Sequence, residues 1–151
     1  MAQGAIERSA TAVWKGDLLG GSGMFYSASG ALRDQAVTWA ARTGSSSDGK
    51  TSPEELVAAA HATCYSMAFS HYLTTNFTAP DQLEVTSTVG LGPKEGGGVQ
   101  VNYSHLTVRG KVAGLDQAGF QAAATEAEKG CPISNLIRNG AEITVEATLE
   151  G

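Results

Sequence analysis

The sequence lacks the uninterrupted run of about eighteen apolar residues that a membrane-spanning helix needs. Its first residues also lack the apolar stretch of a secretion signal, so we expect a soluble, cytoplasmic protein. The 10 Lys and Arg residues form no basic run, and the formal net charge is −5. This charge argues against nucleic acid or an anionic membrane as the main partner, and it favours a neutral substrate.

Cysteines are scarce, with only Cys64 and Cys131 in the chain. In a reducing compartment, two such cysteines are more often free thiols or a redox pair than a static cross-link. Together with the 3 histidines they form neither a Cys-x-x-Cys nor a His-x-x-x-His pattern, so we expect no structural zinc site and no cofactor. The glycines at 20, 21 and 23 do not match the spacing of a nucleotide-binding loop.

A long helical pattern dominates the middle of the chain, over 51–69 and on to about Leu73. Ser52 is a suitable N-cap, Pro53 suits the first helical position, and Glu55 completes a capping box by reaching back to the N–H of Ser52. Apolar residues occur on nearly every face of this helix, which predicts burial on most sides. The chain of 151 residues is long enough for one domain with a core, so we expect a single domain over 1–151.

The other elements follow from alternation, turn residues and caps. We predict short strands, a hairpin, a helix ended by a left-handed Gly130, a short helix that begins after Cys131, and a last strand. Their predicted ranges are 7–14, 24–29 and 36–40 for the first strands, 83–90 and 99–112 for the hairpin, 116–129 and 132–138 for the helices, and 143–149 for the last strand. The class is α+β, with a small N-terminal antiparallel sheet and a C-terminal hairpin/helix/strand unit. Because these small sheets cannot cover the long apolar helix, we expect dimerisation.

Four residues could carry chemistry, although each also has an ordinary structural role. Cys64 lies about 18 Å along its helix, beyond the reach of the helix dipole, so a cation would have to lower the pKa of its thiol. Arg42, in the polar loop 42–50, could supply that cation and hold the Glu54 carboxylate together with a substrate oxygen. Cys131 can cap a helix N-terminus, where the dipole and free N–H groups favour thiolate. Taken singly, each also fits an ordinary structural role. Cys64 can be a buried small hydrophobe and Arg42 a surface charge, while Glu54 can be a first-turn acid and Cys131 a tolerated helix cap.

His61 precedes Cys64 by one helical turn and could act as a base toward its thiol. That arrangement would suit a Cys–His thiol hydrolase. A histidine in such a place is more often a packed interior residue whose ring is fixed by hydrogen bonds. A third hypothesis is a non-catalytic module that binds a small apolar ligand and in which both thiols are incidental.

Several motifs resemble those of the OsmC/Ohr hydroperoxide reductases. They are TSPEELVAAAHATCYSMA and KGCPIS, together with W-K-G-D near the N-terminus and G-A-E-I-T-V-E near the C-terminus. The likeness extends over nearly the whole chain, and AHATC with KGCPIS is more similar to the OsmC branch than to the Ohr branch. The resemblance implies an OsmC-like fold and an intertwined homodimer whose active sites are built from both subunits.

The resemblance also implies a reaction, in oxidative and osmotic stress defence. Cys64 would attack the distal oxygen of an organic hydroperoxide and become a sulfenic acid, and Cys131 would condense with it to a disulfide. A lipoyl-type or other dithiol would then reduce this disulfide. Glu54 and an arginine would lie beside the thiolate, with Arg42 as the match by position and Arg33 as the alternative.

A dry site rich in alanine, Met and Phe would prefer organic hydroperoxides over hydrogen peroxide. The candidate lining residues are Tyr65, Met67 and Phe69, although core packing is the more usual role for Met67 and Phe69. Helix geometry adds a constraint that does not depend on the family. Glu54 and Cys64 are ten residues apart, or about 15 Å along one straight helix. They can serve one thiolate only if Glu54 comes from a second chain or the helix breaks near the alanines. The intertwined homodimer that the resemblance implies agrees with the first option, and we therefore predict a dimer that is obligatory for activity.

Overall fold

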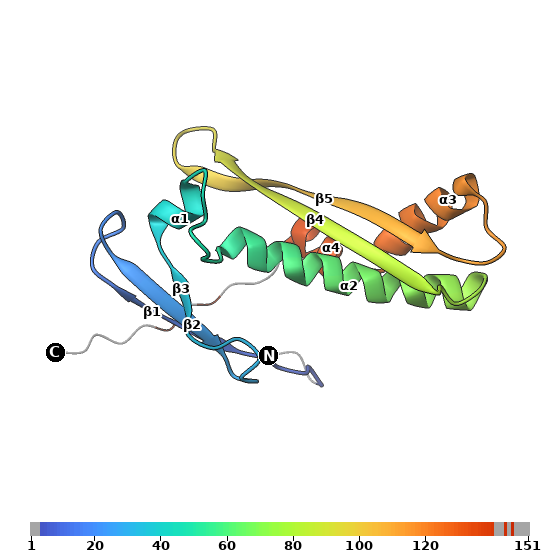
Figure 1. Ribbon diagram of the computed structural model, residues 1–151, viewed down its shortest axis with the longest axis horizontal. Coiled ribbons are helices and arrows are strands. Elements are labelled where there is room, and N and C mark those ends of the chain that lie inside the picture. The colour runs from blue at the N-terminus through green and yellow to red at the C-terminus, as the bar shows by residue number, and fades with distance from the viewer. Residues whose placement is uncertain (1–3, 141–143, 145, 147–151) are drawn as a thin grey trace. The chain divides into compact units, whose positions relative to one another are not determined.

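The computed structural model describes residues 4–140, 144 and 146. The chain divides into two compact units, Met1–Leu56 and Val57–Gly151, and the division falls inside the long helix α2 (Pro53–Asn76; Figure 1). The α+β class predicted from the sequence is confirmed. The single domain over 1–151 stays a prediction.

The first unit contains a small antiparallel sheet, as predicted. Strands β1 (Ala10–Lys15), β2 (Ser22–Ser27) and β3 (Gln35–Val37) pair in the order β1-β2-β3 and are drawn in blue to cyan in Figure 1. Phe25, in the central strand, pairs with Ala12 on one side and Gln35 on the other, and it is buried. The alternation of the sequence therefore found these strands to within a few residues.

The predicted strand over 36–40 is wrong beyond Val37. The chain instead forms a short helix, α1 (Trp39–Thr43), whose N-cap Thr38 accepts a hydrogen bond from the N–H of Ala41 through its hydroxyl (3.1 Å). A threonine cap followed by alanine and arginine favours helix over strand here. As a consequence, Arg42 lies in the last turn of a helix and not in a loop.

Helix α2 begins as predicted and continues one turn beyond its predicted end. The Ser52 hydroxyl accepts a hydrogen bond from the N–H of Glu55 (3.1 Å), while the Glu55 carboxylate accepts from the Thr51 hydroxyl (2.8 Å) and not from the Ser52 N–H. The helix is unbroken through its 24 residues to Asn76. In the described part of the chain, neither α2 nor any other helix is long and apolar enough to cross a membrane.

The second unit adds a long antiparallel hairpin to α2. Strands β4 (Gln82–Pro93) and β5 (Val99–Lys111) pair along their whole length, with a register shift between Gly90 and Leu91. The hairpin lies along α2 (yellow in Figure 1), and the half-buried residues of one face pack toward the core. Both predicted strands are confirmed.

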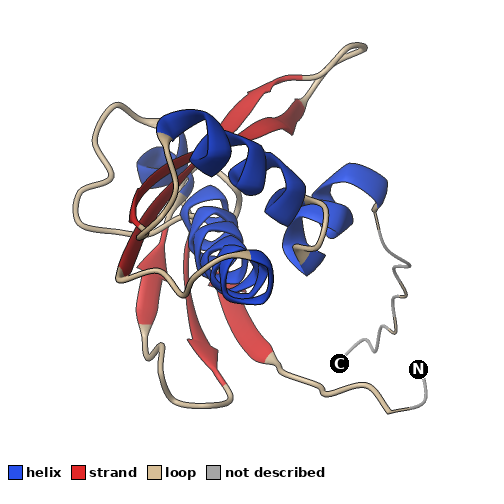
Figure 2. Ribbon diagram, turned by 90° about the vertical axis from the view of Figure 1, so that its right-hand side faces the viewer, coloured by secondary structure: helices blue, strands red, loops and turns tan. Residues whose placement is uncertain are grey.

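Helices α3 (Gln117–Glu128) and α4 (Pro132–Asn139) follow the hairpin and are seen beside α2 in the view along that helix (Figure 2). Asp116 caps α3 as predicted, by accepting from the N–H of Gly119 (2.8 Å). The predicted left-handed Gly130 is wrong, because Gly130 is not among the positive-φ glycines. The chain leaves α3 through short-range bonds from Gly130 N–H to Ala127 O and from Cys131 N–H to Glu128 O (both 3.1 Å), which bring it straight into α4. The strand predicted over 143–149 falls mostly outside the described residues.

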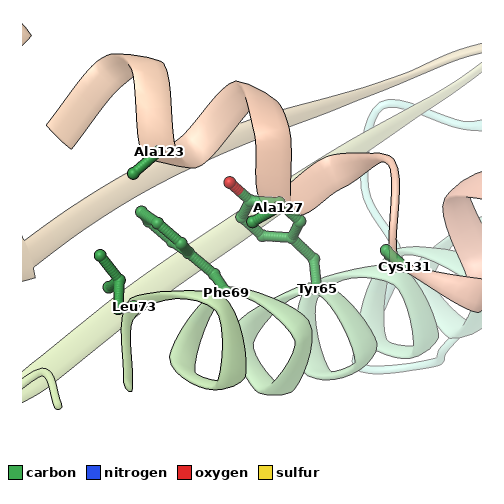
Figure 3. Close-up of a cluster of buried hydrophobic side chains, with 6 residues drawn as sticks. All are labelled: Tyr65, Phe69, Leu73, Ala123, Ala127 and Cys131. Atoms are coloured by element: carbon green, nitrogen blue, oxygen red, sulfur yellow. The ribbon is translucent and has the colours of Figure 1, made fainter. Parts of the chain in front are cut away.

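The core of the second unit lies between α2 and α3, and the inner face of the hairpin packs against it. Three large side chains of α2 point toward two alanines of α3 (Figure 3), and small residues at that contact let the two helices approach closely. The buried members of this core are Tyr65, Phe69, Leu73, Ala123, Ala127 and Cys131. Cys131 thus belongs both to the core and to the start of α4.

Phe69 should contribute most to the stability of this core. Its side chain is fully buried, and its ring lies 5.7 Å from that of Tyr65 and 5.2 Å from that of Phe120, between centroids. We expect Phe69→Ala to lower the free energy of unfolding by about 3–5 kcal/mol, because it leaves a cavity. Urea denaturation at fixed protein concentration measures this, with Phe77→Ala, at a half-exposed position, as the matched control. Equal losses in the two variants would contradict the assignment of the core.

Candidate active site

The first unit holds a partly buried ion pair between Arg42 and Glu54. Arg42 Nη2 lies 2.7 Å from Glu54 Oε1, and Arg42 Nε lies 3.2 Å and 3.1 Å from Oε1 and Oε2, so the guanidinium grips the carboxylate with two nitrogens. Arg33, the alternative, donates through its Nε to the carbonyl of Gly30 in its own turn (3.0 Å). The structure therefore pairs Arg42 with Glu54, as the sequence predicts.

The charge state of Glu54 is set by opposing effects. Burial alone would raise the pKa of Glu54, but the hydrogen bond from Arg42, the backbone N–H of Glu54 and the charge of Arg42 together lower it below its usual value. Glu54 is therefore a carboxylate at neutral pH, and it holds the guanidinium in one orientation. The Trp39 ring supports the same group, with Arg42 Cζ 5.7 Å from the ring centroid.

An apolar pocket of about 550 Å³ adjoins this ion pair in the first unit. Arg42 is the charged residue of its lining, and two tryptophans belong to its wall. No pattern in the sequence indicated this pocket, although Trp14 belongs to the W-K-G-D motif. The lining consists of Ala10, Thr11, Ala12, Trp14, Leu18, Phe25, Val37, Thr38, Trp39, Arg42, Thr51, Pro53 and Leu56.

The second unit brings the two cysteines together as free thiols. Cys64 is half-buried on α2, and Cys131 is fully buried at the N-cap of α4, where its sulfur accepts from the N–H of Ser134 (3.5 Å). The predicted cap is thereby confirmed. Cys64 packs against the core cluster that contains Cys131, and the neighbouring Cys131 thiol shifts its pKa. Two neighbouring thiols can form a disulfide where their Cα atoms lie within about 7 Å of each other.

The surroundings of Cys64 in the second unit do not activate it. Burial raises the pKa of the Cys64 thiol, the N–H of Ile133 lowers it to a smaller extent, and the neighbouring Cys131 raises it further. Among the described residues of the second unit, no cation is one of the groups that shift this pKa. In these surroundings the thiol is protonated at neutral pH and is a poor nucleophile.

His61 does not face the thiol as a base would. Its Nδ1 lies 2.6 Å from the Ser104 hydroxyl and its Nε2 lies 2.7 Å from the Ser134 hydroxyl, so both ring nitrogens are occupied. Burial lowers the pKa of His61, an effect that the charge of Glu128 partly opposes. The sequence allowed His61 to be either a base toward Cys64 or a packed interior residue. The structure shows the packed, hydrogen-bonded residue, and this geometry argues against the Cys–His hydrolase.

The three candidate substrate-lining residues lie in different surroundings. Tyr65 and Phe69 pack in the core of the second unit, and the Tyr65 hydroxyl donates to the carbonyl of Ala124 (2.8 Å). Met67 is 67% exposed on α2. Their contact with substrate stays a prediction. Among the described residues, no group of three His, Cys, Asp or Glu side chains is placed to hold a metal ion.

The structure thus assembles the four predicted site residues as two pairs, Arg42 with Glu54 and Cys64 with Cys131. A bidentate arginine held by a buried carboxylate can bind and polarise a substrate oxygen. A pair of neighbouring thiols can be oxidised and reduced reversibly. Each pair thus has chemistry of its own, oxygen binding in the first unit and thiol redox chemistry in the second.

Comparison with curated proteins identifies relatives in two named groups. The peroxiredoxin OsmC of Escherichia coli K12 is 33% identical over 145 residues, which are 96% of this chain and 98% of that protein. An organic hydroperoxide resistance protein of Xanthomonas axonopodis pv. citri is also 33% identical, over 104 residues that cover 68% of this chain and 69% of the relative.

Solved structures lead to the same group. The organic hydroperoxide resistance protein OhrB of Bacillus subtilis superposes with a TM-score of 0.67 and 25% identity, covering 87% of this chain and 91% of that one. The family model described as OsmC-like protein matches residues 44–146, a range that contains Glu54, Cys64 and Cys131. The motifs, the fold and these matches agree, and the chain belongs to the OsmC-like protein family.

Proposed function

We propose that this protein is a thiol peroxidase that reduces organic hydroperoxides to alcohols. The observation that carries the proposal is the proximity of two free thiols, the half-buried Cys64 on α2 and the buried Cys131 at the start of α4. The relatives support it, since one is named a peroxiredoxin and another an organic hydroperoxide resistance protein.

The proposed cycle has three balanced steps. The Cys64 thiolate attacks the distal oxygen of R–O–O–H, the O–O bond breaks, and the alcohol ROH leaves with a proton while Cys64 becomes a sulfenic acid. The Cys131 sulfur then attacks the Cys64 sulfur, and the hydroxyl leaves as water with the proton of Cys131. A lipoyl-type or other dithiol reduces the resulting disulfide and is itself oxidised to a disulfide. The cytoplasm is the proposed location of this cycle.

In this proposal, the cation that activates Cys64 is the Arg42 guanidinium of a second subunit, which the Glu54 carboxylate of that same subunit holds in place. Helix α2 is unbroken, which removes the option of a break between Glu54 and Cys64, and ten helical residues span about 15 Å. The raised pKa of Cys64 in the single chain also calls for an outside cation. We therefore propose an intertwined homodimer with shared active sites.

Exposed apolar side chains on both units support this assembly. In the first unit Val13, Trp14 and Met24 are between 42% and 47% exposed, and in the second unit Val99 and Met67 are 50% and 67% exposed. Exposed apolar residues in such number are typical of surfaces that a partner covers. A second copy of the chain would bury them.

The apolar pocket beside Arg42 supports an organic substrate. A guanidinium at the edge of an apolar cavity suits a molecule that carries a polar peroxide group on a hydrocarbon body. Hydrogen peroxide gains nothing from such a cavity. The resemblance to the OsmC/Ohr family adds defence against oxidative and osmotic stress as the proposed physiological role.

The same pocket also favours one alternative, a non-catalytic module that binds a small apolar ligand. The two functions differ in their dependence on sulfur. Ligand binding should survive the loss of both thiols, whereas peroxide reduction should not.

The roles of the two cysteines are tested by mapping oxidation. One equivalent of cumene hydroperoxide should produce an intramolecular bridge between Cys64 and Cys131 in the wild type. In Cys131→Ser a sulfenic acid should accumulate at Cys64, because no resolving thiol remains. Mass spectrometry with a sulfenic-acid trap measures both products. If Cys64→Ser consumes hydroperoxide as fast as the wild type, the proposed function is wrong.

The cation is tested by the pH dependence of the first step. The double variant Arg42→Met with Glu54→Gln removes both charges without leaving a buried carboxylate unpaired. Because a nearby cation favours the thiolate, we expect its rate profile to shift to higher pH by roughly one unit or more. Single-turnover kinetics between neutral and alkaline pH measures the shift. Arg33→Met is the matched control and should keep the wild-type midpoint, and an unshifted midpoint in the double variant would remove Arg42 from the mechanism.

Sharing of the sites between subunits is tested by mixing one inactive and one impaired protein at neutral pH. Cys64→Ser is unfolded and refolded together with the Arg42→Met, Glu54→Gln double variant. If each site uses Cys64 of one subunit and Arg42 of the other, a mixed dimer regains one intact site, and statistical mixing restores about a quarter of the wild-type activity. If each site belongs to one subunit, every site keeps one defect and activity stays at the level of the separate variants.

A further inference from the structure

A chain of hydrogen bonds crosses the second unit and is not used by the proposed cycle. It runs from the Ser87 hydroxyl to the Ser104 hydroxyl (2.9 Å), on to His61 Nδ1 (2.6 Å), and from His61 Nε2 to the Ser134 hydroxyl (2.7 Å). His61 is 4% exposed and Ser134 is 3% exposed. The chain therefore joins the hairpin, α2 and α4 through a buried imidazole.

The spacing along both helices places this bond next to the two thiols. His61 precedes Cys64 by three residues on α2, and Ser134 follows Cys131 by three residues at the start of α4. Residues three apart on a helix share a face, so the His61–Ser134 bond and the Cys64–Cys131 contact join the same two helices one turn apart. Ser134 takes part in both, because its hydroxyl contacts His61 and its N–H donates to Cys131 Sγ.

Helix α4 depends on such contacts for its position. It has only 8 residues, fewer than an isolated helix needs to be stable in water. Two polar contacts hold it to the end of α3, an Arg138–Glu128 ion pair and a bond from Asn135 Nδ2 to the Lys129 carbonyl. The bond to His61 joins it directly to α2, which carries Cys64.

Burial keeps the His61 ring neutral by lowering its pKa. The ring faces Ser104 from β5 and Ser134 from α4, and the charge that opposes this shift is that of Glu128 of α3, whose carboxylate is paired with Arg138. A neutral imidazole has one donor and one acceptor, so one serine donates to it and the other accepts from it. Each partner of the ring is thereby satisfied without an unpaired buried charge.

We propose that His61 is a positioning residue for disulfide formation, which holds the first turn of α4 against α2 so that the Cys131 sulfur reaches Cys64. This inference depends on the proposed function, because the step that it serves is the attack of Cys131 on the Cys64 sulfenic acid. In that step the S–O bond breaks, the S–S bond forms, and water leaves with the proton of Cys131. His61 takes no proton in it and acts only through Ser134.

The test separates sulfenic-acid formation from disulfide formation in single-turnover reactions with cumene hydroperoxide. Ser134→Ala and His61→Gln are expected to form the Cys64 sulfenic acid at the wild-type rate. They should close the disulfide roughly five- to tenfold more slowly, as expected from the loss of one buried hydrogen bond. Dimedone trapping followed by mass spectrometry reports both rates. The trapped adduct should therefore be abundant in these variants and scarce in the wild type.

Matched variants separate positioning from a general loss of stability. Ser104→Ala removes the hydroxyl on the other side of His61 and should slow disulfide closure by a smaller factor than Ser134→Ala does. Ser104→Thr keeps a hydroxyl at this position, which lies on a strand and suits threonine, and should close the disulfide at the wild-type rate. Ser66→Ala makes the same change on α2, where the hydroxyl donates to the Thr63 carbonyl of the same helix, and should have no effect. The inference is overturned if Ser134→Ala closes the disulfide at the wild-type rate, or if sulfenic-acid formation slows by the same factor as closure.

A second oxidant distinguishes this inference from the proposed function. Diamide oxidises neighbouring thiols to a disulfide and is itself reduced to a hydrazine, so it needs no peroxidase activity. If hydroperoxide leaves the wild-type thiols reduced while diamide closes the bridge, the proposed function fails and the diamide rates still decide the role of His61. Slower diamide closure in Ser134→Ala supports that role, and equal closure refutes it.

Discussion

The contact between α2 and the first turn of α4, where Cys64 meets Cys131, is the constraint on which the rest of the proposed chemistry depends. Three local features create it. The chain leaves α3 by tight, short-range bonds, Pro132 begins α4 without needing a backbone N–H partner, and Cys131 is left at the N-cap with its sulfur turned to the helix N–H groups. A longer connection between α3 and α4 would give the thiol more freedom and would lengthen its path to Cys64.

The second pair is organised by a different physical effect. Burial of Glu54 would by itself favour the neutral acid, and the two-nitrogen grip of Arg42 reverses that preference. The guanidinium is therefore oriented before any thiol or substrate reaches it, as electrostatic preorganisation requires. In the proposed dimer this prepared cation meets a thiol that is protonated in the single chain, so activation of Cys64 would follow from assembly. The reactive Cys64 thiolate would then form only in the assembled dimer, where the Cys131 thiol and the pocket beside Arg42 are also present.

Local sequence signals predicted the long elements and the caps well. The Ser52 cap, the period-two hairpin and the Cys131–Pro132 helix start are each written in neighbouring residues, and the structure confirms all three. Helix α1 was missed because five residues are too few to show a helical period, and a strand was predicted in its place. The expected left-handed Gly130 failed for a related reason, since the next helix begins at once and requires a different exit from α3.

Long-range partners were beyond these signals, and His61 shows why. Its spacing from Cys64 correctly indicates that both residues share one face of α2, but helical spacing does not say what that face contacts. The structure answers with serines that lie 43 and 73 positions away in the sequence, one on the hairpin and one on α4. Both ring nitrogens are thereby engaged, so no free lone pair remains to accept a proton from Cys64. The spacing that first suggested a Cys–His base thus reflects two neighbouring links between the same pair of helices, one made by an imidazole and a hydroxyl and the other by two sulfurs.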